Sequence, residues 1–129
     1  MGSYLSIVIG CFYDIFMKEM DADLITMEID LYWVTKAGHD PVEIFKRYPG
    51  RFKLWHFKDQ TRPSAPVYKV EKEDITSVGA GSIDFKRIYA SREISGLKNF
   101  FVEDDNQGNG KPFVGIETSI KNLTTKILV

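Results

Sequence analysis

Three short apolar segments of the chain each end near a side chain that can bind a metal ion. The segments are residues 25–33 with Asp30, residues 52–59 with His56, and residues 99–104 with Glu103. Near-continuous apolar runs of this length are typical of strands buried in a parallel sheet. Because parallel strands place their C-terminal ends at one rim of the sheet, we expect the three side chains to converge there.

The three side chains form a mixed set of one nitrogen and two oxygen donors. Such a set suits a divalent cation such as Mn²⁺, Mg²⁺ or Zn²⁺. Taken singly, an Asp, His or Glu at the end of a strand is more often a helix cap, a satisfied polar group or a salt-bridge partner. The matched positions of all three favour a metal site. A purely structural role as caps or salt-bridge partners remains the alternative.

Helical patterns alternate with the strand-like segments. We expect a first strand over residues 4–9 and helices over 12–20, 41–48, 84–94 and 111–127, the last with Phe113, Ile116, Ile120 and Leu123 at helical spacing. Asp40, followed by Pro41, and Asp84 are predicted helix N-caps. Four strand-then-helix units predict an α/β fold with parallel strands and right-handed crossovers.

The segment from residue 60 to residue 82 is the longest irregular stretch. It follows the strand that carries His56, so we interpret it as a lid, with a short strand over residues 67–70. The glycines Gly79 and Gly81 do not form a phosphate-binding loop, because no Lys-Ser or Lys-Thr pair follows them. They are expected to supply a turn.

The chain has 129 residues, and four strand-helix units supply half of a (β/α)₈ barrel, which needs at least about 200 residues. An open half would expose two sheet edges and an apolar inner face. We therefore expect two copies to associate so that eight strands close, or nearly close, a barrel across a two-fold axis.

Composition excludes several classes of function. The net charge is −1, which disfavours nucleic-acid binding. No run of about 18 apolar residues predicts a membrane span. The single cysteine, Cys11, fits a reducing compartment, and the start of the chain lacks the basic region and cleavage site of a secretory signal. We expect a cytoplasmic protein.

Four stretches, residues 27–34, 48–59, 78–84 and 101–105, together resemble the sugar phosphate isomerase/epimerase family, whose members have xylose isomerase-like TIM barrels. The resemblance extends from about residue 12 to the end of the chain, and residues 1–11 do not match. It implies one partial domain over residues 1–129 that corresponds to the C-terminal half of such a barrel.

The resemblance also implies roles for individual residues. In the family a divalent cation is held by Glu, Asp, His and Glu on successive late strands, and Asp30, His56 and Glu103 match the last three. Glu103 would also be a catalytic acid or base, acting beside the carbonyl of a sugar or sugar phosphate. Arg62, Lys58 and Trp33 would bind the substrate.

One family position is missing. The first ligand, a Glu on the strand before Asp30, has no counterpart, since residues 4–9 contain no acidic side chain. We therefore expect weak or no activity from the chain alone, and whether it is an enzyme stays open. Two alternatives are a metal-dependent endonuclease of abasic DNA, which the near-neutral charge disfavours, and a non-catalytic oligomeric half-barrel that serves as a binding or scaffold protein.

Overall fold

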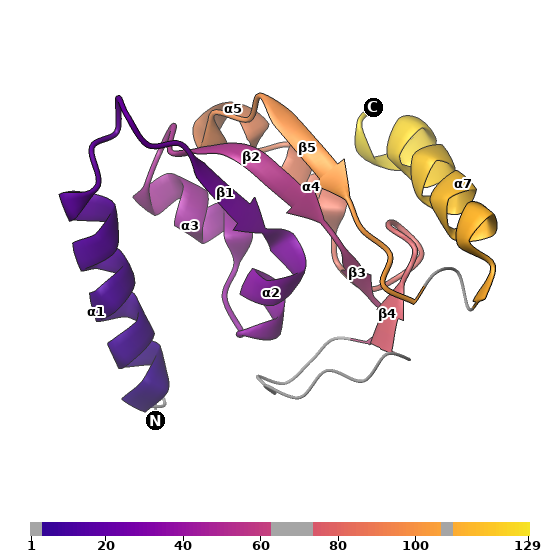
Figure 1. The fold of residues 1–129 in the computed structure, drawn as a ribbon, viewed down its shortest axis with the longest axis horizontal. Helices are drawn as coiled ribbons and strands as arrows, with labels where there is room; N and C mark the ends of the chain where they lie inside the picture. The colour runs from indigo at the N-terminus through magenta and orange to yellow at the C-terminus, as the bar shows by residue number, and fades with distance from the viewer. Residues whose placement is uncertain (1–3, 63–73, 107–109) are drawn as a thin grey trace.

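The computed structural model describes residues 4–62, 74–106 and 110–129 (Figure 1). The helices are α1 (Tyr4–Glu19), α2 (Leu31–Lys36), α3 (Pro41–Arg47), α4 (Phe85–Tyr89), α5 (Arg92–Ser95) and α7 (Pro112–Asn122), and a π-helical turn, η2 (Leu123–Ile127), follows α7 directly. The strands are β1 (Met27–Asp30), β2 (Phe52–Phe57), β3 (Asp59–Gln60), β4 (Ile75–Thr76) and β5 (Asn99–Val102).

The main sheet contains β1, β2 and β5 in that order, and both neighbouring pairs are parallel. Helices α2 and α3 connect β1 to β2, and α4 and α5 precede β5 (Figure 1). A small antiparallel pair, β3 with β4, extends from the end of β2. The predicted α/β class with a parallel sheet is confirmed.

The prediction of a strand over residues 4–9 is wrong, because these residues form the first half of α1. A short apolar run does not distinguish a buried strand from a helix by periodicity alone. Here the run continues without a break into the predicted helix over residues 12–20, and Gly10 does not interrupt it. The described residues therefore contain three strand-helix units instead of four.

Helix α1 is held to the rest of the fold at its C-terminal end. The Arg51 guanidinium donates hydrogen bonds to the backbone carbonyls of Met17, at 3.1 Å, and Met20, at 3.2 Å. These carbonyls belong to the last turn of a helix, where a cation is favourable. Asp14 accepts hydrogen bonds from Arg47 of α3 and from Tyr48, the residue that follows α3, and the Met17 side chain is buried.

The two faces of the main sheet differ. Ile29 of β1 and Trp55 of β2 are buried against the helices, and the Trp55 ring stacks on Phe45 of α3 at 4.9 Å between ring centroids. Trp55 donates its indole N–H to the Ser95 hydroxyl of α5 at 2.7 Å. Side chains alternate along a strand, so the other face carries Asp30 and His56.

Asp59 organises the loop between β4 and α4. Its buried carboxylate accepts backbone N–H bonds from Gly79 and Gly81, both at 2.9 Å, and from Gln60 and Ile83. A Cβ on Gly81 would lie 2.2 Å from the carbonyl oxygen of Gln60. The glycines therefore serve a tight turn around one carboxylate, as the sequence predicts.

The C-terminal helix differs from the expectation. Of its four spaced apolar residues, Leu123 is buried, whereas the other three are exposed: Phe113, Ile116 and Ile120. The inward side is polar, and Ser119 and Asn122 hydrogen-bond the backbone N–H and carbonyl of Val78. Among the described residues, no helix is both long and apolar enough to cross a bilayer.

The expected strand over residues 67–70 lies outside the described residues. The same holds for the middle of the expected lid, so the lid stays a prediction. At the two ends of the lid segment, β3 pairs with β4 in an antiparallel hairpin. This pairing brings residue 61 to the backbone of residue 74 through a 2.8 Å hydrogen bond.

Candidate metal centre

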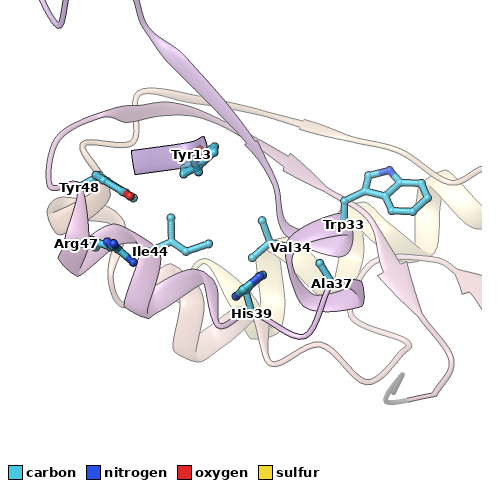
Figure 2. Close-up of a pocket in the computed structure, with 8 residues that line it drawn as sticks. All are labelled: Tyr13, Trp33, Val34, Ala37, His39, Ile44, Arg47 and Tyr48. Atoms are coloured by element: carbon cyan, nitrogen blue, oxygen red, sulfur yellow. The ribbon is translucent and has the colours of Figure 1, made fainter. Parts of the chain in front are cut away.

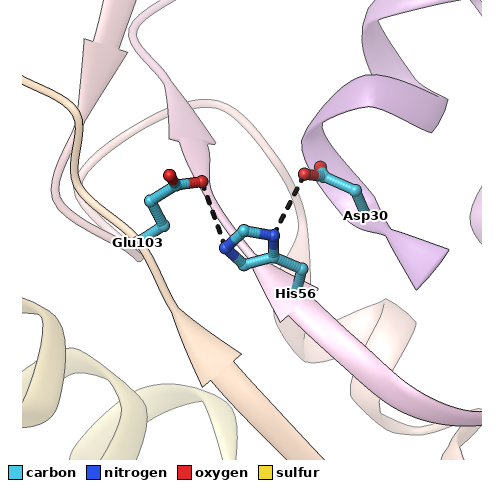
Figure 3. A group of neighbouring side chains, drawn as sticks. All are labelled: Asp30, His56 and Glu103. Atoms are coloured by element: carbon cyan, nitrogen blue, oxygen red, sulfur yellow. Dashed lines mark ion pairs between the residues drawn. The ribbon is translucent and has the colours of Figure 1, made fainter. Parts of the chain in front are cut away.

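Asp30, His56 and Glu103 meet at the C-terminal rim of the parallel sheet (Figure 3). His56 lies between the two carboxylates. Its Nδ1 is 3.3 Å from Oδ2 of Asp30, and its Nε2 is 3.1 Å from Oε2 of Glu103. One donor atom from each residue lies within 4.8 Å of the other two. The convergence that the sequence predicts is present.

Strand register produces this convergence. Asp30 pairs with His56 across β1 and β2, and His56 pairs with Phe101 across β2 and β5. Glu103 follows two residues later on the same side, and its N–H donates to the Phe57 carbonyl at 2.9 Å, which extends the ladder by one step.

Asp30 has two functions at this rim. Its Oδ1 accepts the backbone N–H of Trp33 at 2.9 Å and caps α2, which starts directly after β1. Its Oδ2 faces His56. The cap fixes the carboxylate at the end of the strand and leaves one oxygen directed at the candidate centre.

Lys58 lies beside the cluster but is turned into the protein. Its side chain is 6% exposed, its ammonium pairs with Asp105, and Nζ lies 3.4 Å from Oε2 of Glu103 and 5.4 Å from the centre of the Tyr32 ring. Burial acts to lower the pKa of Lys58, but Asp105 and Glu103 raise it above its ordinary value. The hydrogen bond from Lys58 holds the pKa of Asp105 below its ordinary value. Lys58 is therefore a fixed positive charge next to Glu103.

The other two expected substrate contacts are solvent-exposed. The Trp33 side chain is half-exposed, and its ring packs edge-on against Tyr32. Arg62 is exposed at the edge of the described region. The backbone N–H of Trp33 donates a hydrogen bond to Asp30, which connects Trp33 to the three candidate ligands. Within residues 4–62, 74–106 and 110–129, Arg62 makes no hydrogen bond or ion pair with these ligands.

The residues present fit a divalent cation. The three side chains are partly exposed, at 22% for Asp30, 23% for His56 and 38% for Glu103, so an ion can reach them. One imidazole nitrogen and two carboxylate oxygens match the preferences of Zn²⁺ and Mn²⁺. Without an ion, the same groups form two His–carboxylate pairs.

A separate hollow lies between α1 and the pair α2 and α3 (Figure 2). Its volume is about 280 Å³, and its lining is mostly apolar. The lining includes Tyr13, Val34, Ile44 and Tyr48, and none of the three candidate ligands contributes to it. In Figure 2 the Trp33 ring projects away from the other lining residues. The hollow is distinct from the candidate metal centre.

Sequence reasoning missed two members of this neighbourhood. Asp105 neutralises Lys58, and Tyr32 lies under it with a buried hydroxyl that has no hydrogen-bond partner among the described residues. The sequence feature that could have identified Asp105 is the run of three acidic residues at 103–105. No sequence pattern identifies Tyr32, because a Tyr in a buried segment is usually a core residue.

The fold is that of part of a TIM barrel, and the candidate metal centre lies at its C-terminal rim. The structural neighbours include two sugar phosphate isomerase/epimerase structures from Parabacteroides distasonis. One is 29% identical with a TM-score of 0.72 over 91% of this chain and 36% of that chain, and the other is 27% identical with a TM-score of 0.65 over 88% and 36%. The predicted resemblance to sugar phosphate isomerase/epimerase proteins with xylose isomerase-like barrels is confirmed.

More distant and sequence-based comparisons agree. The fold is shared with the IOLI protein, solved with a zinc atom, at 17% identity and a TM-score of 0.59 over 79% of this chain and 38% of that one. An inosose dehydratase from Lacticaseibacillus casei is 30% identical over 107 residues, which are 76% of this chain and 36% of that protein. One from Clostridium botulinum is 36% identical over 87 residues, 59% of this chain and 28% of that protein. No model of a protein family matches.

The matched part of the chain thus spans about a third of the length of these relatives, which agrees with the predicted partial barrel.

Proposed function

We propose that this chain provides the metal centre of a sugar isomerase/epimerase-like barrel, with Asp30, His56 and Glu103 as ligands of a divalent cation, Mn²⁺, Mg²⁺ or Zn²⁺. The observation that carries the proposal is the approach of these three side chains to within 4.8 Å at the C-terminal rim of a parallel sheet. That rim is where barrels of this type build their active sites. The sugar phosphate isomerase/epimerase neighbours and the zinc atom in the IOLI structure support it.

The bound cation would polarise the carbonyl and hydroxyl oxygens of a sugar or sugar phosphate. Glu103 would move the proton on the adjacent carbon. Its Oε2 lies 3.1 Å from Nε2 of His56 and 3.4 Å from Nζ of Lys58, and more than a third of its side chain is open to solvent. It is both accessible and held by two neighbours.

Substrate would be held around this carboxylate. The exposed Trp33 indole offers an apolar surface to the sugar ring, and exposed Arg62 offers a positive charge to a phosphate or hydroxyl group. Buried Lys58 contributes its charge next to Glu103. The inosose dehydratase relatives add inosose to the substrates proposed for this chain. Removal of a proton beside a carbonyl is a step common to both reaction types.

Activity of the isolated chain is expected to be weak or absent, because only Glu103 is available as a proton-moving carboxylate at the position that the family resemblance assigns. The alternative function is that of a non-catalytic oligomeric half-barrel that binds or organises other molecules. The solvent-exposed apolar residues of α7 favour this alternative, since they suit an association surface.

Exchange of solvent deuterium into a keto-sugar tests the proposal, since it detects proton transfer without full turnover. The chain with Mn²⁺ should catalyse exchange at the carbon beside the carbonyl, and Glu103→Gln should abolish it. Glu93→Gln is the matched control, because that carboxylate is 88% exposed on α5. Exchange that persists in Glu103→Gln contradicts the role of Glu103, and absence of exchange in the native chain favours the non-catalytic alternative.

A further inference from the structure

The hollow between α1 and the pair α2 and α3 has the size of a small-ligand site (Figure 2). Its volume is about 280 Å³. An apolar cavity of about 150 Å³ already holds a benzene ring, and ligand pockets begin at about 300 Å³. The hollow can therefore take one aromatic ring with a short arm. Because none of the three candidate metal ligands lines it, this inference does not rest on the proposed function.

The walls of the hollow suit an aromatic ring. Tyr13 of α1 packs edge-on against Tyr48, with 5.7 Å between the ring centroids and 69° between the ring planes. Val34 of α2 and Ile44 of α3 also line the hollow, and both are packed against the hydrophobic core. A ligand ring placed here would exchange water for aliphatic carbon and would gain edge-to-face contacts with the tyrosines.

The polar groups of the lining favour an anionic ligand. Among the eight lining residues that the structure describes, none is acidic and two are basic, Arg47 and His39. In Figure 2 these two side chains lie on either side of Ile44. The His39 side chain makes no hydrogen bond or ion pair within residues 4–62, 74–106 and 110–129. The hollow therefore offers basic groups beside an apolar wall.

Arg47 can bind an anion without releasing its present partner. It donates one hydrogen bond, from a terminal nitrogen to the Asp14 carboxylate, which also accepts a hydrogen bond from the Tyr48 hydroxyl. A guanidinium has five N–H donors, and in the part of the chain that the structure describes the remaining ones have no hydrogen-bond partner. The Arg47 side chain is 59% exposed, so a ligand can reach these donors. A carboxylate forms strong, charge-assisted hydrogen bonds with such a group.

We propose that the hollow binds a small aromatic carboxylate, with the ring between Tyr13, Val34 and Ile44 and the carboxylate at Arg47. The apolar walls select the ring, and the remaining guanidinium donors select the negative charge. A cationic ligand would be repelled by Arg47. An aliphatic anion would lack the edge-to-face contacts with the tyrosines.

Titration of the full chain with phenylacetate, 2-phenylethanol and 2-phenylethylamine tests the proposal, because these probes share a ring on a short arm and differ in charge. Saturation-transfer NMR measures the three affinities. We expect phenylacetate to bind about tenfold more tightly than the alcohol, and the amine to bind most weakly. In a chain labelled at its methyl groups, the protons of the probe ring should show contacts with the methyl groups of Val34 and Ile44.

Substitutions locate the site. Ala37→Leu fills the hollow from the end of α2 and should weaken the binding of phenylacetate at least about tenfold. Arg47→Gln can still hydrogen-bond Asp14 but has no charge, so it should bind phenylacetate and the alcohol equally, whereas Arg47→Lys should keep the preference for the anion. His56→Gln, at the candidate metal centre, is the matched control and should bind phenylacetate like the native chain.

The proposal is overturned if the native chain binds none of the probes at millimolar concentration, or binds all three with equal affinity. Unchanged affinity in Ala37→Leu, or probe contacts with methyl groups other than those of Val34 and Ile44, would place the probe elsewhere and also overturn it. Circular dichroism establishes that each variant is folded. If Arg47→Gln does not fold, the preference of the native chain among the three probes still decides whether the site selects an anion.

Discussion

Lys58 and His56 both contact a single oxygen of Glu103. Oε2 of this carboxylate is 3.1 Å from Nε2 of His56 and 3.4 Å from Nζ of Lys58, so a buried ammonium group and a candidate metal ligand share one acceptor. The ammonium is held in place by Asp105. The orientation of Glu103 therefore depends on groups that reach it from both sides.

Replacement of Lys58 should destabilise the fold. Lys58→Met removes a buried cation and leaves Asp105 and Glu103 facing each other without it. Because both carboxylates are partly exposed, we expect a loss of about 1–3 kcal/mol in the free energy of unfolding, less than for a fully buried pair. Urea denaturation measures it, and Lys46→Met, at an exposed pair with Glu43, should cost less than about 0.5 kcal/mol. Equal effects of the two substitutions would contradict this account.

Asp59 should be among the most sensitive positions in the chain. Asp59→Ala removes the acceptor of four backbone N–H groups that are buried or partly buried around the turn at residues 79–83. The expected loss is about 2–4 kcal/mol, since unsatisfied buried donors are costly. Thermal or urea unfolding measures it.

Gly81→Ala gives an independent check of the same turn. The added Cβ would collide with the Gln60 carbonyl, at 2.2 Å, and with the Asp59 carboxylate, so the variant should also lose stability. Gly110→Ala is a useful contrast, because its φ is positive but a Cβ there meets nothing within 4 Å. Gly81→Ala should therefore be the more damaging substitution, and the reverse order would refute the packing argument.

The free energy of unfolding should depend on pH through the Asp40 carboxylate. Arg87 donates two hydrogen bonds to this carboxylate, at 2.8 and 3.1 Å, and these bonds hold the pKa of Asp40 below its ordinary value. The unfolded chain then binds the proton more readily than the native chain. The pair stabilises the fold above the unfolded pKa of about 4 and loses this contribution as the pH falls through the native pKa.

Comparison of the native chain with Arg87→Met at several pH values tests this dependence. The two should differ by about 0.3–1 kcal/mol at pH 7, as expected for a partly exposed pair, and should converge at the acid end. A difference that stays constant from pH 7 down to pH 3 would show that the Arg87 effect is one of packing and not of charge.

Association of two copies stays a prediction, and the exposed surface gives it a specific form. Every residue of β5 is exposed, and Phe101 projects from the same face as His56 with 55% of its surface open. Light scattering at micromolar concentration should give the mass of a dimer, and Phe101→Glu should shift it toward the monomer. A folded native chain that stays monomeric would rule out a barrel closed by two copies.

The sequence predicted the site better than its surroundings. Each candidate ligand closes a strand-like run, and parallel pairing then leaves little freedom in where Asp30, His56 and Glu103 can lie. The N-caps at Asp40 and Asp84 were predicted equally well. A short acidic side chain before a helical pattern accepts a backbone N–H of the first turn, and this local interaction can be read from the sequence.

The errors lie where tertiary context decides. The apolar run over residues 4–9 fits a strand or a helix equally well, and its continuity with the next segment makes it helical. Helix α7 presents its polar side to the fold because Ser119 and Asn122 satisfy the Val78 backbone. A long-range hydrogen bond of this kind leaves no local sequence pattern, so helical spacing alone does not identify the buried side of α7.

The most direct test of the central claim is titration of the purified, metal-stripped chain with Zn²⁺ and Mn²⁺, in parallel with His56→Ala. We predict one cation bound per chain, with binding lost in His56→Ala and retained in His39→Ala, whose imidazole lines the separate hollow. Binding that is absent from the native chain, or that His56→Ala leaves unchanged, would contradict a metal centre built from Asp30, His56 and Glu103.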